Sequence, residues 1–140
     1  CQLIQQETGI EATLHVHERD RDFLRIQNKL LSTYKAGIRN LICMTSDGVA
    51  SVADRLNRGL DLAGNRMGSQ TGLLLGVEVN PSANDMDDEL RRFESRVKAG
   101  AEFAVTRPVF NLDSLDVFLN FGIPVIAGIR PLTSFRDSVP

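Results

Sequence analysis

The sequence predicts an α/β protein with parallel strands, and within that class a (β/α)8 TIM barrel of which this chain covers about five β/α units. Short β-branched runs alternate with longer helical patterns, as parallel strands joined by right-handed crossovers require. Polar residues recur just after each run, and no run is followed by a convincing Gly-rich dinucleotide fingerprint. These two observations favour a barrel over an open doubly wound sheet, which the alternation alone also allows.

A closed barrel of this kind needs roughly eight strands and about 250 residues, whereas the chain has 140 residues. We therefore expect 1–140 to form one partial barrel domain, with its first strands and its C-terminal end missing.

The first elements are expected to be the end of one helix and a complete β/α unit. The opening residues have helical character up to Gly9, which is typical of a helix end. A β-branched run then predicts a strand over 12–17. Apolar residues near the 3.6-residue period predict a helix over 20–35, with Asp20 as its N-cap and Gly37 as its stop.

The second unit begins with a mostly apolar run over 38–44, which predicts a strand covered on both faces. Cys43 lies inside this run, so we expect a small buried side chain there. Residues 45–48 end the strand. Helical spacing of valine and leucine predicts the next helix over 49–62, and a Gly-rich connector follows over 64–72.

The remaining elements repeat the alternation. Asn111 is a candidate N-cap for the last complete helix, and Gly122 a stop signal after it. A further helix is expected to open after Arg130. The complete elements are two helices over 86–98 and 112–121 and three strands over 73–79, 103–105 and 124–129.

Composition excludes several classes of protein. A net charge of −2 and a pI near 5.7 argue against a general nucleic-acid binder. No apolar run approaches the about 18 residues that a membrane span needs. Two cysteines are too few for a disulfide framework, and with two histidines they show no zinc-ligand spacing. We therefore expect a cytoplasmic globular domain without a metal site.

The side chains that follow the expected strands combine donors, acceptors and both charges, which suits a polar heterocyclic ligand. These side chains are His15, His17, Glu18, Arg19, Asp20, Thr45, Ser46, Asp47, Glu78, Asn80, Thr106, Arg107 and Arg130. His15 and His17 share one strand face but lack a third ligand, so they make a weak metal site. Asp47 precedes Gly48, which allows either an Asp-Gly turn or a functional strand-end carboxylate. The residues alone leave the ligand open.

Several motifs resemble, in order, segments of the methylenetetrahydrofolate reductase family. The stretch 36–42, followed by Asp47, is similar to the segment before that family's flavin-facing aspartate. Residues 97–106 resemble its KVxAGAxFxITQ segment, and 123–132 resemble its IPVIAGIxPL strand. The segment 56–61 is most similar to members fused behind a homocysteine methyltransferase module. The resemblance covers most of the chain.

This resemblance implies a barrel that binds FAD at its C-terminal end. It also implies that NAD(P)H reduces 5,10-methylenetetrahydrofolate to 5-methyltetrahydrofolate there, in one-carbon and methionine metabolism. Asp47 matches the catalytic aspartate near the flavin, and Arg107 and Phe110 match substrate-binding positions. The partners implied are folate, NAD(P)H, a second copy of the chain in a homo-oligomer and a homocysteine methyltransferase domain. The cofactor-binding positions implied are His15, Asp47, Asn80, Glu89, Arg96 and Ala101.

An arginine at position 96 suits a pyrophosphate because guanidinium matches phosphate in a bidentate way. Without the resemblance, Glu89 and Arg96 read equally well as an exposed pair on a helix face.

The chain departs from the family pattern at positions that bear on activity. The family's catalytic glutamate, in a Phe-Glu motif on the first barrel strand, has no counterpart in 1–140. Its Gly-Asp-Pro-Pro turn is replaced by 46–49, and the short spacing after Asp47 indicates a missing loop near 47–48. Its Thr-Gln pair is Thr106 and Arg107, and arginine only donates hydrogen bonds where glutamine also accepts them.

These departures keep two other functions open. One is a non-catalytic or altered-specificity reductase-like subunit that binds flavin or pterin. The other is a pterin-dependent methyl-transfer barrel without flavin, which shares the fold. The sequence does not discriminate NADH from NADPH.

Overall fold

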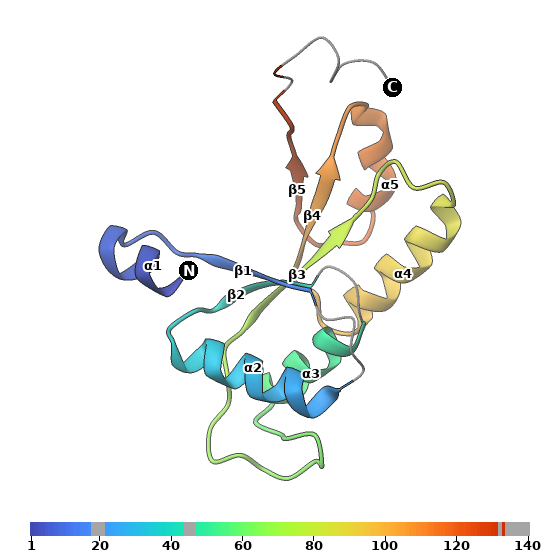
Figure 1. Ribbon diagram of the computed structural model, residues 1–140. Coiled ribbons are helices and arrows are strands. Elements are labelled where there is room, and N and C mark those ends of the chain that lie inside the picture. The colour runs from blue at the N-terminus through green and yellow to red at the C-terminus, as the bar shows by residue number, and fades with distance from the viewer. Residues whose placement is uncertain (18–21, 44–46, 132, 134–140) are drawn as a thin grey trace.

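The computed structural model describes residues 1–17, 22–43, 47–131 and 133, and it alternates strands with helices along the chain (Figure 1). The elements are α1 (Gln2–Thr8), β1 (Thr13–Val16), α2 (Phe23–Lys35), β2 (Asn40–Cys43), α3 (Asp47–Asn57), β3 (Leu74–Val79), α4 (Met86–Lys98), β4 (Phe103–Pro108), the 3-10 helix η1 (Leu112–Leu115), α5 (Asp116–Leu119) and β5 (Val125–Gly128).

The five strands form one parallel sheet in the order β1-β2-β3-β4-β5. Each strand therefore pairs with the strand before it in the chain, and the order never reverses as it does at the switch point of a doubly wound sheet. In Figure 1, helices α2, α3, α4 and α5 lie along the outer side of the curved sheet. This arrangement is an arc of a (β/α)8 barrel, which confirms the predicted fold class.

The hydrophobic core lies between the sheet and its helices. On the helix side, Phe93 of α4 is fully buried and packs edge-to-face against Phe118 and Phe121, with ring centroids 5.6 and 4.8 Å away. The strand residues of the core are Val16, Leu41, Cys43, Leu75, Val77, Val79 and Ala104. Burial of Cys43 confirms the prediction for this thiol. Because the core side chains of the strands point toward the helices, the side chains between them point to the opposite face of the sheet.

The opposite face, which we call the inner face, carries the side chains that alternate with the core residues. Strand register places His15, Ile42 and Gly76 in one row of this face. A side chain at Gly76 would collide with the Phe103 ring, so glycine is required for this packing. Ile126 is 54% exposed on this face. The inner face is therefore accessible within the described part of the chain.

Two predicted helix ends are wrong. Helix α2 is capped by Asp22, whose carboxylate accepts the amide of Arg25 at 3.1 Å; the predicted cap, Asp20, lies outside the described residues. Helix α3 starts at Asp47 and stops at Asn57, five residues before the predicted end at 62. It stops because Gly59 adopts φ 74° and the amides of Gly59 and Leu60 bond back to the carbonyls of Leu56 and Arg55, at 3.0 and 2.9 Å. The Asn57 side chain then bonds the backbone N–H and C=O of Leu73, at 2.9 and 2.8 Å.

Other boundaries shift for local reasons. Strand β4 continues through Pro108, three residues beyond the predicted 103–105. The predicted helix over 112–121 is instead a 3-10 turn followed by α5, although the expected Asn111 cap is confirmed by its 3.1 Å bond to the Asp113 amide. Gly9 closes α1 with φ 71° as expected. The expected helix after Arg130 falls largely outside the described residues.

Candidate functional site

A cavity of about 340 Å³ lies at the carboxyl ends of β3 and β4, against helix α4. This is the end of the sheet where the residues that follow each strand converge, and where sites of parallel α/β proteins form. Charged groups dominate its walls. The lining residues are Glu78, Val79, Asn80, Ala83, Asn84, Asp85, Asp88, Glu89, Arg92, Arg96 and Arg107.

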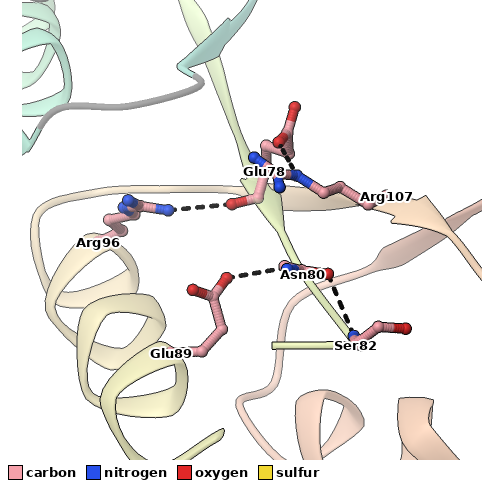
Figure 2. Close-up of polar contacts among 6 residues, drawn as sticks. All are labelled: Glu78, Asn80, Ser82, Glu89, Arg96 and Arg107. Atoms are coloured by element: carbon pink, nitrogen blue, oxygen red, sulfur yellow. Dashed lines mark hydrogen bonds and ion pairs between the residues drawn. The ribbon is translucent and has the colours of Figure 1, made fainter. Parts of the chain in front are cut away.

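Glu78, the fifth residue of β3, joins two arginines from different elements (Figure 2). Its backbone carbonyl accepts a hydrogen bond of 2.9 Å from Nη1 of Arg96. Its carboxylate Oε1 accepts one of 2.7 Å from Nε of Arg107 on β4. The Glu78 side chain is 14% exposed and the Arg107 side chain 56%, so the pair has one shielded and one accessible member.

Asn80 follows β3 and is fixed on both sides. Its backbone amide donates to Oε1 of Glu89 at 2.8 Å, and its side-chain oxygen accepts the amide of Ser82 at 3.1 Å, which forms an Asx turn (Figure 2). The Glu89 carboxylate thus links α4 to the chain that leaves β3. These contacts hold the rim of the cavity in one conformation.

Helix α4 presents its charged face to the cavity because of its sequence pattern. Its N-cap Asp85 accepts the amide of Asp88 at 2.9 Å, and acidic residues fill its first turn, where the helix dipole favours negative charge. Glu89, Arg92 and Arg96 follow at spacings of three and four residues, which places them on one face. Arg92 pairs with Asp88 at 2.6 Å.

Two titratable side chains in or beside the cavity, Arg107 and Cys43, have shifted pKa values. Hydrogen bonding and charge from Glu78, with a smaller contribution from the charge of Glu89, raise the pKa of Arg107, so this guanidinium stays protonated. Burial raises the pKa of the Cys43 thiol to about 12, and the positive charge of Arg96 offsets part of this effect. Cys43 is therefore a neutral thiol at physiological pH and no candidate nucleophile.

Four of the predicted site residues meet at this cavity: Asn80, Glu89, Arg96 and Arg107. Arg96 is 8% exposed, so the alternative interpretation of an exposed helix-face pair is wrong for this residue. Asn80 and Arg107 belong to the expected strand-end set, whereas Glu89 and Arg96 come from helix α4, so three segments of the chain contribute to the cavity.

Of the other four predicted residues, three are described and do not line this cavity: His15, Ala101 and Phe110. His15 is exposed on the inner face of β1, two strands away from β3. Ala101 is buried just before β4, at the end of that strand opposite to Arg107. Phe110 is 70% exposed beyond β4. Asp47 is the first residue of α3, and its side chain lies outside what the structure describes.

Within the described residues, no group of three His, Cys, Asp or Glu side chains could hold a metal ion. His15 and His17 therefore have no third protein ligand in this part of the chain. In the same residues, no helix combines the length and the apolar character needed to cross a bilayer.

Sequence reasoning placed Glu78 after its strand but gave it no role. The signal was present, because Glu78 is the one charged residue in an otherwise apolar strand, Leu74–Val79. Its register partner is Val105, and Arg107 lies two residues further along β4. The alternation pattern predicts which face of the sheet a side chain is on, but not which residue of the next strand lies beside it. The contact between Glu78 and Arg107 therefore became visible only from the pairing of the strands.

Comparison with known proteins gives similarity to solved structures and to a family of sequences. A solved structure of a 4-hydroxy-2-oxoglutarate aldolase/2-deydro-3-deoxyphosphogluconate aldolase from TTHB1 is 18% identical over 98% of this chain, with a TM-score of 0.48. The chain spans 57% of the length of that aldolase. The sequence model of the family described as methylenetetrahydrofolate reductase matches residues 1–138, nearly the whole chain. The chain therefore belongs to the methylenetetrahydrofolate reductase family.

Proposed function

We propose that this chain is the flavin- and folate-binding region of an FAD-dependent 5,10-methylenetetrahydrofolate reductase that uses NAD(P)H in the cytoplasm. The observation that carries the proposal is the meeting of Asn80, Glu89, Arg96 and Arg107 at one cavity in a chain of this family. These residues were expected from motif position to bind cofactor or substrate. Their gathering from three segments is what such a site requires.

The chemistry of the cavity suits the polar part of a flavin dinucleotide. Its guanidinium groups can bind phosphate oxygens, and its carboxylates can accept hydrogen bonds from hydroxyl groups. A volume of about 340 Å³ is at the low end of the roughly 300–1,000 Å³ typical of ligand pockets. The cavity would therefore hold one portion of the dinucleotide, with the rest extending along the rim.

Within this proposal, each residue has a distinct task. Arg96 would hold the pyrophosphate and Glu89 the ribityl hydroxyls, and the Asn80–Glu89 bond keeps that carboxylate oriented. FAD, when bound, would supply the redox centre between NAD(P)H and the folate. Arg107 would donate hydrogen bonds to the substrate, and Asp47 would be the acidic group beside the reacting rings.

Three further residues complete the proposal on the resemblance. His15 and Ala101 would contact the cofactor and Phe110 the substrate. The position of His15 supports this role, because its side chain is exposed on the inner face of β1. The homo-oligomer and the homocysteine methyltransferase partner also rest on the resemblance.

The proposal is tested on the purified full-length protein. We expect a yellow protein that bleaches when NADH or NADPH is added without oxygen and recovers its colour when methylenetetrahydrofolate follows. Whichever nucleotide bleaches it faster is the preferred donor. A colourless protein that takes up no added FAD contradicts the proposal.

A matched pair of variants tests whether the FAD that colours the protein binds at this cavity. Arg96→Gln is expected to weaken FAD binding about 10-fold or more, because it removes a charge-assisted donor. Arg91→Gln is the control, since Arg91 is on the same helix, 72% exposed, and does not line the cavity. Equal loss in both variants would argue against FAD at this cavity. Melting temperatures show whether either change unfolds the protein.

A second candidate is a reductase-like subunit that binds flavin without turning over methylenetetrahydrofolate. The Glu78–Arg107 ion pair favours it, because this pair stands where the family pattern has a glutamine. Such a subunit would bleach with NAD(P)H and would not recover with methylenetetrahydrofolate. The flavin-free methyl-transfer alternative predicts no visible absorbance at all.

A further inference from the structure

The Glu78–Arg107 ion pair is a feature of the cavity to which the expected cofactor contacts assign no role. The geometry points to Glu78 as a positioning residue that holds Arg107 along the sheet. In this position the pair selects a planar heterocycle that presents a ring carbonyl, over one that presents an amino group. The inference deepens the proposed function and rests on it for the class of ligand.

The first step concerns which atoms remain available. Nε of Arg107 is occupied by Oε1 of Glu78 at 2.7 Å, and this is the one hydrogen bond its side chain makes within the described residues. The two Nη atoms belong to a side chain that is 56% exposed and lines the cavity. A guanidinium has donors and no acceptor, so it can satisfy only ligand acceptors.

The second step concerns why the acceptor is neutral. The positive charge of Arg107 is already compensated by the Glu78 carboxylate, and Glu89 adds negative charge nearby. A carboxylate on the ligand would compete with Glu78 and meet repulsion from both groups. A ring carbonyl accepts the same hydrogen bonds without that repulsion.

The third step concerns why the acceptor is on a ring. Glu78 is only 14% exposed, so the bond to its carboxylate keeps Nε close to the surface of the sheet. Glu78 lies on the inner face of β3, and its carboxylate bonds Arg107 of the neighbouring strand β4 (Figure 2). A rigid planar ligand against the inner face can reach such a donor, whereas a flexible chain leaving the mouth of the barrel would not lie flat there.

The test compares three probes on the full-length protein with FAD added: folic acid, its 4-amino counterpart aminopterin, and pteroic acid, which lacks the glutamate. Dissociation constants are measured by calorimetry at about pH 8. The wild type should bind the 4-oxo ligand about 10-fold or more tightly than the 4-amino ligand, because the latter sets donor against donor. Loss of the glutamate should have little effect on binding.

Variants separate the roles of the two residues. Arg107→Gln should bring the 4-oxo preference close to one, because an amide can turn to donate or accept. Arg107→Lys should keep the preference, since an ammonium also only donates. Glu78→Ala should reduce it several-fold, and Glu78→Gln should restore most of it because an amide oxygen still accepts from Nε. Arg91→Gln, away from the cavity, should leave the preference unchanged.

The inference is overturned by an unchanged preference in Arg107→Gln, by equal effects of Glu78→Gln and Glu78→Ala, or by no binding of any probe. It is also overturned if Arg107→Gln weakens folic acid and spares pteroic acid, because Arg107 would then bind the glutamate. FAD binding is read separately from the flavin spectrum. A protein that shows the preference but binds no FAD would retain this inference and lose the proposed function.

Discussion

Arg96 connects the candidate site to the core at the scale of single residues. Its guanidinium bonds the backbone of β3, and its charge is felt by Cys43 on β2. Only 8% of the residue is exposed, so it contributes to packing as well as to the cavity. A change at this position is therefore expected to affect both the fold and ligand binding.

Cys43 gives a prediction that follows from its environment. Because the thiolate is the reactive form and the pKa is raised to about 12, Cys43 should react with iodoacetamide at about pH 8 at least roughly 1,000-fold more slowly than an unperturbed thiol. Cys1 is exposed and serves as the internal comparison. Peptide mapping after timed alkylation measures both rates. Labelling of both at similar rates in the native protein would contradict the assigned burial.

The residue scale also shows what the sequence could reveal. Asn80 and Arg107 were identified as site residues because they follow strands, and position relative to a strand end is a local property. The role of Glu78 depended on which residue of β4 lies beside it, and Phe110 depended on the path of the chain after β4. The contact of Glu78 with Arg107 and the exposure of Phe110 depend on strand pairing and on tertiary packing, which a local sequence pattern does not predict.

At the scale of elements, α4 is the helix that organises the cavity. The sequence predicted its bounds correctly because an N-cap, an acidic first turn, an apolar stripe and basic last residues all agree. The end of α3 was mispredicted because Leu60 continues the apolar spacing, although it belongs to an antiparallel bridge with Arg66. Periodicity does not distinguish a half-buried bridge residue from a helical one.

The N-cap of α4 gives the second prediction. Asp85→Ala should lower the free energy of unfolding by about 1 kcal/mol, because it leaves the Asp88 amide without its carboxylate partner. FAD affinity should fall with it, since the first turns of α4 carry cavity residues. Urea denaturation and flavin titration measure the two effects. Asp87→Ala, in the same turn but not the cap, should cost only a few tenths of a kcal/mol; an equal cost would refute the capping role.

At the scale of the whole molecule, the sheet order was predictable and its openness has consequences. Alternation of strands and helices predicted a parallel sheet, and polar strand ends without a Gly-rich dinucleotide fingerprint favoured the barrel arc over an open sheet. Strand β3 pairs on both sides, whereas β1 and β5 each pair with one neighbour in the described chain. The edges are thus the least protected parts of the sheet.

Hydrogen exchange checks this third prediction. In a polypeptide of these 140 residues, amides of β3 should exchange at least about 10-fold more slowly than those of β1 and β5, because their opening requires disruption of two strand pairs. Mass spectrometry of peptic fragments resolves the strands. Edge strands that exchange as slowly as β3 would mean that another part of the chain, or a second copy, covers them.

The bonds of Asn57 to Leu73 tie helix to strand at the amino end of β3, while the cavity occupies its carboxyl end. Six strand residues put roughly 20 Å between the two, well beyond the range of about 7–10 Å within which mutations usually couple. The contact that attaches α3 to the sheet and the residues that would select the ligand therefore lie at opposite ends of β3. Substitutions that change the ligand at the carboxyl end of β3, in evolution or by design, should therefore leave the Asn57–Leu73 contact at its amino end undisturbed.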